Sequence, residues 1–160
     1  MGQGDVMTHE LIFERHVHLP REMIWRAWTT PALICEWFCP LPWKVTECQI
    51  DLIPGGQFRT VMQSPQGEKF PHVGCYLDIV PNEKLVWTNA LQPGYAPTLE
   101  VNPMITAIIT LSQQGDTTHY LARALHKDDK DRAAHEAMGF HEGWGKAFDQ
   151  LVALMQRQPA

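Results

Sequence analysis

The amino-acid sequence predicts an α+β fold in which a curved, seven-stranded antiparallel sheet covers a long C-terminal helix. A strand with period-two alternation opens the chain, and turn residues at roughly ten-residue spacing divide its middle into short apolar runs. A proline-free amphipathic segment follows. Because such a sheet has one face to bury and a long helix can cross it, we expect two layers with a cavity between them.

The first strand and two short helices are expected near the N-terminus. Residues 11–17 alternate between the two faces of a half-buried strand. Pro20 suits the first position of a helix that Pro31 must end. A second short helix is expected over residues 31–37, because Pro40 follows closely.

Six further strands are expected between Trp43 and His126, arranged as a meander. Glycine, proline and amide side chains supply the turns between them. These turn clusters are residues 54–56, 64–67, 81–83 and 113–116. The proline-rich segment 92–104 is longer than a hairpin turn, and we expect it to lie over one mouth of the cavity.

The segment from Lys130 to Arg157 is expected to form one long helix. Its apolar residues recur at three- and four-residue steps, and aspartates at its start complement the helix dipole. Gly143 and Gly145 inside it each cost about 1 kcal/mol relative to alanine. Close packing on the sheet or a local bend would offset that cost.

Composition indicates one globular domain over residues 1–160, with a folded core over 9–157 and residues 1–8 extended or disordered. Apolar residues make up 44% of the chain and charged residues 19%. The net charge is −5 and the basic residues do not cluster. We therefore do not expect the protein to bind nucleic acid. No apolar stretch is long enough to suggest a membrane span.

The N-terminus and the cysteines favour a cytoplasmic location. Residues 1–10 have neither a basic region nor an apolar core of the kind found in secretory signals. The four cysteines form no CxxC pair and are expected to be reduced. Glu14, His16 and His18 share one strand face, but it is the solvent face, so we expect no metal site and no cofactor.

Several segments, taken in order, carry a resemblance to a known family. They are Arg15 with residues 20–29, residues 30–40, residues 51–58, residues 74–86, and residues 139–151. Together they resemble the family of activator-of-heat-shock-protein-90-ATPase homologues in the START-like superfamily, which includes polyketide cyclases, dehydratases and birch-allergen-like proteins. The resemblance implies a helix-grip fold with a cavity between sheet and helix, and frequent homodimerisation.

Large aromatic and methionine side chains are expected to line that cavity, since small-molecule sites are mostly apolar. The alternative is that these side chains simply form the hydrophobic core. We consider Trp37, Phe140 and Trp144 the strongest candidates. The full set of expected ligand-binding residues is Trp37, Phe38, Trp43, Phe58, Met62, Tyr76, Trp87, Met104, Met138, Phe140, His141, Trp144 and Phe148.

Three functions stay open at this point. The first is binding of a small apolar or aromatic molecule. The second is an enzyme similar to the superfamily's cyclases and dehydratases, with His141, Tyr76 and His72 as candidate acid–base residues and Arg15 and His119 as further polar groups. None of these five has a partner visible in the sequence, so binding is favoured over catalysis. The third, association with a chaperone, is an analogy with the family name alone.

Overall fold

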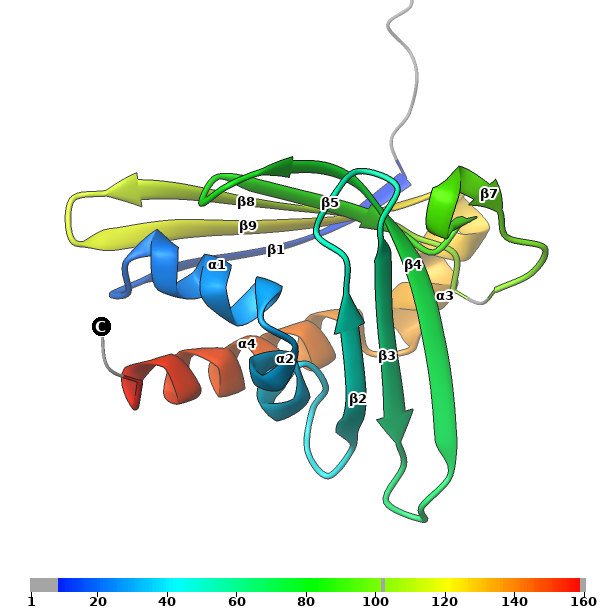
Figure 1. The fold of residues 1–160 in the computed structure, drawn as a ribbon, viewed down its shortest axis with the longest axis horizontal. Coiled ribbons are helices and arrows are strands. Elements are labelled where there is room, and N and C mark those ends of the chain that lie inside the picture. The colour runs from blue at the N-terminus through cyan, green and yellow to red at the C-terminus, as the bar shows by residue number, and fades with distance from the viewer. Residues whose placement is uncertain (1–8, 102, 159–160) are drawn as a thin grey trace, which may run out of the picture.

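The computed structural model describes residues 9–101 and 103–158, in which a seven-stranded antiparallel sheet curves around α-helices (Figure 1). The expected α+β, helix-grip architecture is confirmed, whereas the expectation for residues 1–8 lies outside the described residues. The elements are β1 (His9–Val17), α1 (Arg21–Thr29), α2 (Pro31–Trp37), β2 (Lys44–Ile50), β3 (Gln57–Gln63), β4 (Lys69–Val80), β5 (Lys84–Thr88), β6 (Leu91–Gln92), β7 (Ala96–Pro97), β8 (Thr106–Gln114), β9 (Thr117–His126), α3 (Asp129–Ala137) and α4 (Phe140–Gln156).

The sheet is strongly bent along its strand order β1-β9-β8-β5-β4-β3-β2. In Figure 1, β1, β8 and β9 run across the molecule, while β2, β3 and β4 run down it. The pairing register shifts between Tyr76 and Asp78 in β4 and between Val45 and Glu47 in β2. Such irregularities increase the local bend and twist of a strand, which suits a sheet that must turn around a helix.

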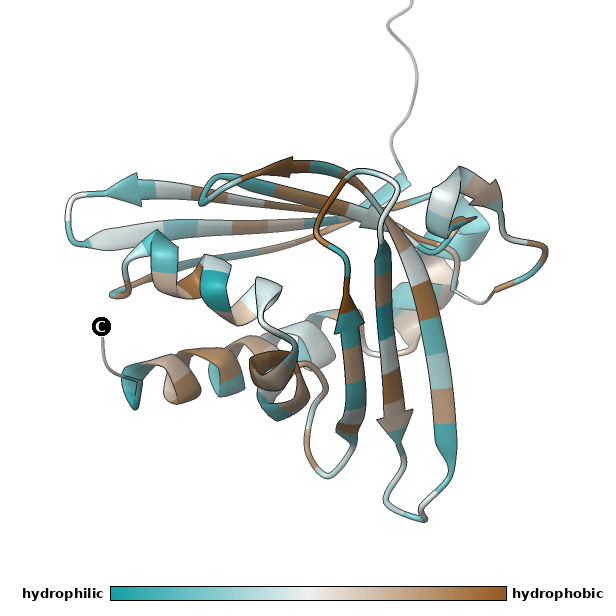
Figure 2. Cartoon of the chain, in the orientation of Figure 1, coloured by the Kyte–Doolittle hydropathy of each residue, from teal (hydrophilic) through white to brown (hydrophobic). Residues whose placement is uncertain are grey.

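The core lies on the concave side of this bend, where α1, α2 and α4 are found (Figure 1). Strand β9 alternates strictly between half-buried and buried residues, as the period of a strand requires. Figure 2 shows the same alternation as hydrophilic and hydrophobic bands along β2, β3 and β4. The buried side chains of the sheet therefore meet the apolar stripe of α4.

The structure corrects the expected single helix over residues 130–157, because α3 and α4 are separate helices. Gly139 between them has a φ of 95°, in the left-handed region that commonly ends a helix. The Asp128 side chain caps the start of α3 by accepting from the Asp131 N–H at 2.8 Å. The six strands expected between residues 43 and 126 are all present in the sheet, and the proline-rich segment adds the short β6–β7 pair.

Gly145 allows α4 to approach β1 closely. A Cβ at this position would lie 3.4 Å from Nη2 of Arg15 and 3.5 Å from Cε1 of Phe13. At Gly143, by contrast, a Cβ would meet only Cγ of Pro40, at 3.9 Å. The first glycine is explained by close packing on the sheet, whereas the second leaves space in front of the helix.

Alanine at two of the glycines is expected to have opposite effects on stability. Gly139→Ala should lower the free energy of unfolding by about 1 kcal/mol or more, because alanine disfavours a positive φ. Gly143→Ala should raise it by up to about 1 kcal/mol, because alanine is the better helix former and its methyl group meets no close neighbour. Urea unfolding measures both, and a gain in stability from Gly139→Ala would contradict the helix break.

A pair of buried histidines, not anticipated from the sequence, joins α3 to β9. Nδ1 of His126 donates to the His9 carbonyl oxygen at 2.8 Å, which leaves Nε2 of His126 to accept from Nδ1 of His135 at 2.8 Å. Burial, and to a lesser degree the neighbouring His126, lowers the pKa of His135 to about 4. The fold therefore holds His135 in its neutral form.

Stability is expected to fall as the pH drops below about 6.5, the ordinary pKa of histidine. The pKa of His135 is lower in the folded state, so the unfolded chain takes up this proton first and gains stability relative to the fold. Urea unfolding at pH 7 and pH 5 should show a smaller decline for His135→Gln than for the wild type. The control His18→Gln, at an exposed residue just after β1, should keep the wild-type decline. Equal declines in all three proteins would contradict this role.

Candidate functional site

A cavity of about 530 Å³ lies between the concave face of the sheet and the N-terminal half of α4. Strands β3, β4 and β5 form one wall, and residues 143–148 of α4 form the opposite wall. Residues 37–40, at the end of α2, also border it. The loop between β5 and β8 contributes Gln92, Thr98, Glu100, Val101 and Pro103. The volume is within the range of small-molecule sites in proteins.

Aromatic rings in edge-to-face contact form much of this wall. Trp28 and Trp37 have ring centroids 5.0 Å apart, and Phe38 lies 5.4 Å from Trp37 and 5.5 Å from Phe58. Trp87 continues the series, 5.2 Å from Phe58. Edge-to-face pairs of this kind each contribute about 0.5–1.5 kcal/mol beyond their burial. The rings therefore hold one another in place without a ligand.

Strand pairing and hydrogen bonds explain why these side chains face inward. Phe58, Thr60 and Met62 are spaced by two residues along β3, so all three face the cavity. Thr60 is paired with His72 of β4, which lines the cavity beside it. A hydrogen bond fixes the orientation of the Trp37 ring, because its Nε1 donates to the Ala27 carbonyl oxygen at 2.9 Å.

Many of the side chains suggested by the sequence meet at this cavity. Trp144 and Phe148 occupy one face of α4, four residues apart, as the helical period requires. His72 is the catalytic candidate that lines the cavity. The suggested ligand-binding residues found in the wall are Trp37, Phe38, Phe58, Met62, Trp87, Trp144 and Phe148.

Three of the other suggested residues do not line the cavity. Trp43 is 37% exposed and packs on Phe70, with ring centroids 5.6 Å apart. Met138 is 64% exposed, because it sits at the break between α3 and α4 and not inside a continuous helix. Met104 is half-buried but does not line the cavity.

The first turn of α4 also places its aromatic and histidine residues differently from expectation. Phe140 is buried outside the wall, in contact with Trp144 and with His135. The His141 ring is exposed, and its Nε2 lies 3.1 Å from a carboxylate oxygen of Glu136. Neither side chain lines the cavity.

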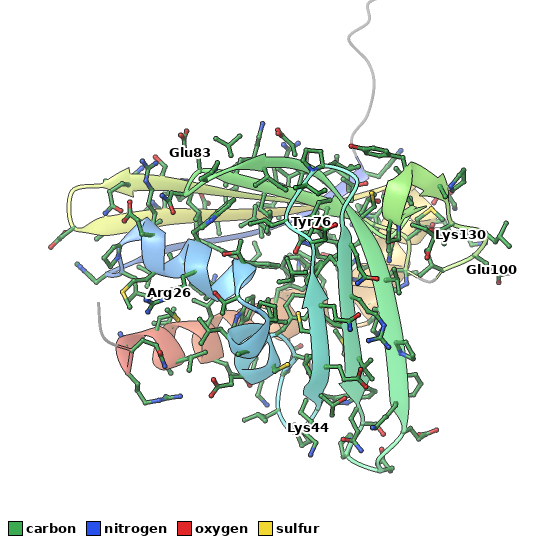
Figure 3. All side chains as sticks on the ribbon, in the orientation of Figure 1. Arg26, Lys44, Tyr76, Glu83, Glu100 and Lys130 are labelled. Carbon is green, nitrogen blue, oxygen red and sulfur yellow. The ribbon has the colours of Figure 1, made fainter. Side chains whose placement is uncertain are left out.

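Tyr76 is fully buried, next to the wall but not part of it. Its ring stacks on Phe58 with a centroid separation of 5.5 Å, and Figure 3 shows it inside the bend of the sheet. Its hydroxyl has no hydrogen-bond partner among the described residues. Burial, with a smaller contribution from the Cys48 thiol, raises the pKa of Tyr76 and keeps its hydroxyl neutral.

The cavity wall carries little charge. His72 is exposed to solvent overall, and the partial desolvation of its ring shifts its pKa below the ordinary value, toward the neutral imidazole. Glu100 is the charged residue of the wall, and Figure 3 shows it on the outer loop. No lysine or arginine belongs to the part of the wall that the structure describes.

The remaining catalytic candidates are not brought together. Cζ of Arg15 lies 4.3 Å from the centre of the Phe13 ring, outside the wall. His119 is beside the carboxylate of Glu14 and stacks on His16, also outside the wall. Within residues 9–101 and 103–158, no cluster of histidine, cysteine and acidic side chains could hold a metal ion, and no helix there could span a membrane.

Residues 18–156 match the family described as Activator of Hsp90 ATPase homolog 1-like protein. The chain belongs to this family. The chain is also similar to a protein from Nitrosomonas europaea whose crystal structure is known. The two sequences are 42% identical and the structures superpose with a TM-score of 0.89, covering 92% of this chain and 94% of that one. The cavity therefore lies in a START-like fold, and this fold is typical of a family of ligand-binding domains.

More distant structures show the same fold. A protein from Mycobacterium smegmatis is 20% identical with a TM-score of 0.77, covering 99% of this chain and 97% of that one. A protein from Rhodobacter sphaeroides is 22% identical with a TM-score of 0.81, covering 94% and 95% of the two chains. None of the curated proteins compared with the chain matches it.

Removing the two buried tyrosine hydroxyls is expected to have different effects on stability. Tyr76→Phe should leave the free energy of unfolding unchanged or raise it by about 1 kcal/mol, because a buried hydroxyl without a partner is a cost to the fold. Tyr120→Phe should lower it by about 1 kcal/mol, because the Tyr120 hydroxyl accepts from Nε1 of Trp28 at 3.1 Å. Urea unfolding of the ligand-free variants measures both, and a larger loss for Tyr76→Phe would contradict the assignment.

Proposed function

We propose that this protein binds a small apolar or aromatic molecule in the cavity between the sheet and α4. The observation that carries the proposal is a space of about 530 Å³ walled by mutually braced aromatic rings. Protein interiors normally pack with few voids larger than a water molecule. A space of this size leaves aromatic surface without contacts, and binding of a ligand would supply them.

The composition of the wall supports an aromatic or otherwise flat apolar ligand. Phe58, Trp87 and Trp144 reach the cavity from three separate elements, so they can surround a ligand. Met62 adds a flexible and polarisable side chain that can adapt to its outline. The wall also has polar side chains, but those of Asn89, Gln92 and Thr98 are hydrogen-bonded within the protein. Apolar contact and shape are therefore expected to decide which molecules bind.

Catalysis has one supporting observation, the neutral His72 at the wall, which could accept a proton from a bound molecule. Within the described wall, however, no second acid–base group contacts His72 to complete a catalytic pair. We therefore propose binding and not cyclase or dehydratase chemistry. Chaperone association and homodimerisation stay expectations drawn from the family.

A cytoplasmic location also remains part of the proposal. Cys39 and Cys48 are free thiols in the structure. Burial raises the pKa of Cys39 to about 11, and burial with a smaller effect of Cys35 raises that of Cys48 to about 12. Thiols held in this neutral form react slowly, which suits unmodified cysteines in a reducing compartment.

Filling part of the cavity from Gly143 should weaken binding without unfolding the protein. Gly143 lines the cavity and has no close neighbour, and leucine is a better helix former than glycine. We expect N-phenyl-1-naphthylamine, a neutral fluorescent probe, to bind the wild type and Gly143→Ala, but to bind Gly143→Leu at least about tenfold more weakly. Urea unfolding should show that Gly143→Leu is as stable as the wild type.

Tryptophan fluorescence provides a second measurement in the same experiment. Trp144 lines the cavity and should account for much of the quenching that the bound probe causes. Trp144→Ala should therefore reduce this quenching, while Trp28, Trp37 and Trp87 in the same wall account for what remains. Unchanged probe affinity in a folded Gly143→Leu variant, or unchanged quenching in Trp144→Ala, would mean that the probe binds elsewhere.

A further inference from the structure

Three polar side chains of the cavity wall have no partner inside the protein. The side chains of Thr60, His72 and Glu100 line the cavity, and none of them forms a hydrogen bond or an ion pair with another described residue. A hydroxyl, a neutral imidazole and a carboxylate can each accept a hydrogen bond. The other amide and hydroxyl side chains of the wall are already bonded within the protein, and they are those of Asn89, Gln92, Thr98 and Tyr120.

Thr60 is the clearest of the three cases, because it is only 3% exposed. It lies on the inward face of β3 and is paired directly with His72 of β4. Buried polar groups in native proteins nearly always have a partner, which is either the protein itself or a bound molecule. The partner of this hydroxyl has to come from the cavity that Thr60 lines.

The charge of the wall favours a cation. Glu100 is negative, the wall as described holds no lysine or arginine, and the lowered pKa of His72 keeps its ring uncharged at pH 7. A cation is attracted by Glu100, whereas an anion is repelled. The half-buried rings of Trp87 and Trp144 strengthen this preference, because the face of an indole attracts cations.

Hydrogen bonds attach the segment that carries Glu100 to the sheet on both of its sides. The Thr98 N–H donates to the Ala90 carbonyl oxygen at 3.0 Å, and Nδ2 of Asn89 donates to the Pro103 carbonyl oxygen at 2.8 Å. Both partners in the sheet follow directly after β5, which forms part of the cavity wall. Glu100 lies between the two attachment points, so its carboxylate stays near the cavity.

The charged and the aromatic parts of the wall differ in their exposure. Glu100 and His72 are exposed to solvent, whereas Trp28, Trp37 and Phe148 are each 3% exposed. A ligand that fits both parts has an aromatic body and one polar end. Its body packs among the buried rings, and its polar end stays close to water, which avoids the cost of burying a charge.

We propose that the ligand is a protonated amine with an aromatic body, and that its ammonium group is directed toward Glu100. This inference rests on the proposed function and narrows it. An ammonium group carries only hydrogen-bond donors, so it matches a wall whose free polar groups accept. Aromatic contacts supply most of the affinity, while the charge of Glu100 sets the orientation and selects amines over carboxylates of the same size.

Three pyrene probes of similar shape separate these contributions. At pH 7, 1-pyrenemethylamine is a cation, 1-pyrenemethanol is neutral and 1-pyrenecarboxylate is an anion. We expect the amine to bind the wild type about twofold to fivefold more tightly than the alcohol, and the carboxylate to bind more weakly than the alcohol by a similar factor. Equilibrium dialysis with pyrene fluorescence measures all three, and raising the salt from about 20 mM to about 300 mM should reduce the differences.

Variants of Glu100 test whether this residue causes the preference. Glu100→Gln should bind the amine and the alcohol equally, and Glu100→Lys should bind the carboxylate more tightly than the amine. Glu83→Gln is the matched control, because it removes the same charge from an exposed residue outside the wall, and Figure 3 shows the two glutamates on different sides of the molecule. This control should keep the wild-type preference. Gly143→Leu should weaken the binding of all three probes in parallel.

The possible results are distinguishable. Equal affinity of the wild type for the three pyrenes, or tightest binding of the carboxylate, overturns the inference and leaves the proposed function intact. A preference for the amine that persists unchanged in Glu100→Gln and Glu100→Lys also overturns it, because the net charge of the protein would then cause the preference. Failure of the pyrenes alone overturns the inference only. Failure of the pyrenes and of N-phenyl-1-naphthylamine overturns the proposed function as well.

Discussion

The close approach of α4 to β1 determines the rest of the architecture. Because Gly145 has no side chain, the helix packs directly onto Phe13 and Arg15. The sheet then bends away through the irregularity in β4, so the same helix cannot follow β3, β4 and β5 (Figure 1). The cavity is the space left between a nearly straight helix and a sheet that turns.

Contacts among side chains hold the cavity wall in place and leave the cavity itself open. Hydrogen bonds from their Nε1 atoms fix the orientations of the Trp28 and Trp37 rings. Edge-to-face contacts in turn restrict the positions of the Phe58 and Trp87 rings. A wall held in this way is preorganised, so a ligand need not order it on binding. The indole N–H of Trp87 is the exception, because it is buried without an acceptor among the described residues.

Local patterns in the sequence predicted the parts of this arrangement that depend on local periodicity. Alternation places Phe58 and Met62 on one face of a strand, and helical spacing brings Trp144 and Phe148 together. The break at Gly139 was missed because apolar residues keep a helical spacing across it, although a glycine in that position is compatible with a helix end.

Contacts between distant segments could not be read from such patterns. Trp43 lies outside the cavity because its ring packs on Phe70 of β4. His126 and His135 form a buried pair because α3 folds back onto β9, and two isolated histidines in the sequence give no sign of it. Likewise, the unpaired donor of Trp87 depends on what surrounds it in three dimensions.

A crystal structure of the protein grown with N-phenyl-1-naphthylamine tests the central claim most directly. We expect density for the ligand in the cavity between Phe58 and Trp144, with the aromatic wall unmoved. Ligand density on the exposed surface formed by Trp43 and Phe70, with the cavity left empty, would contradict it.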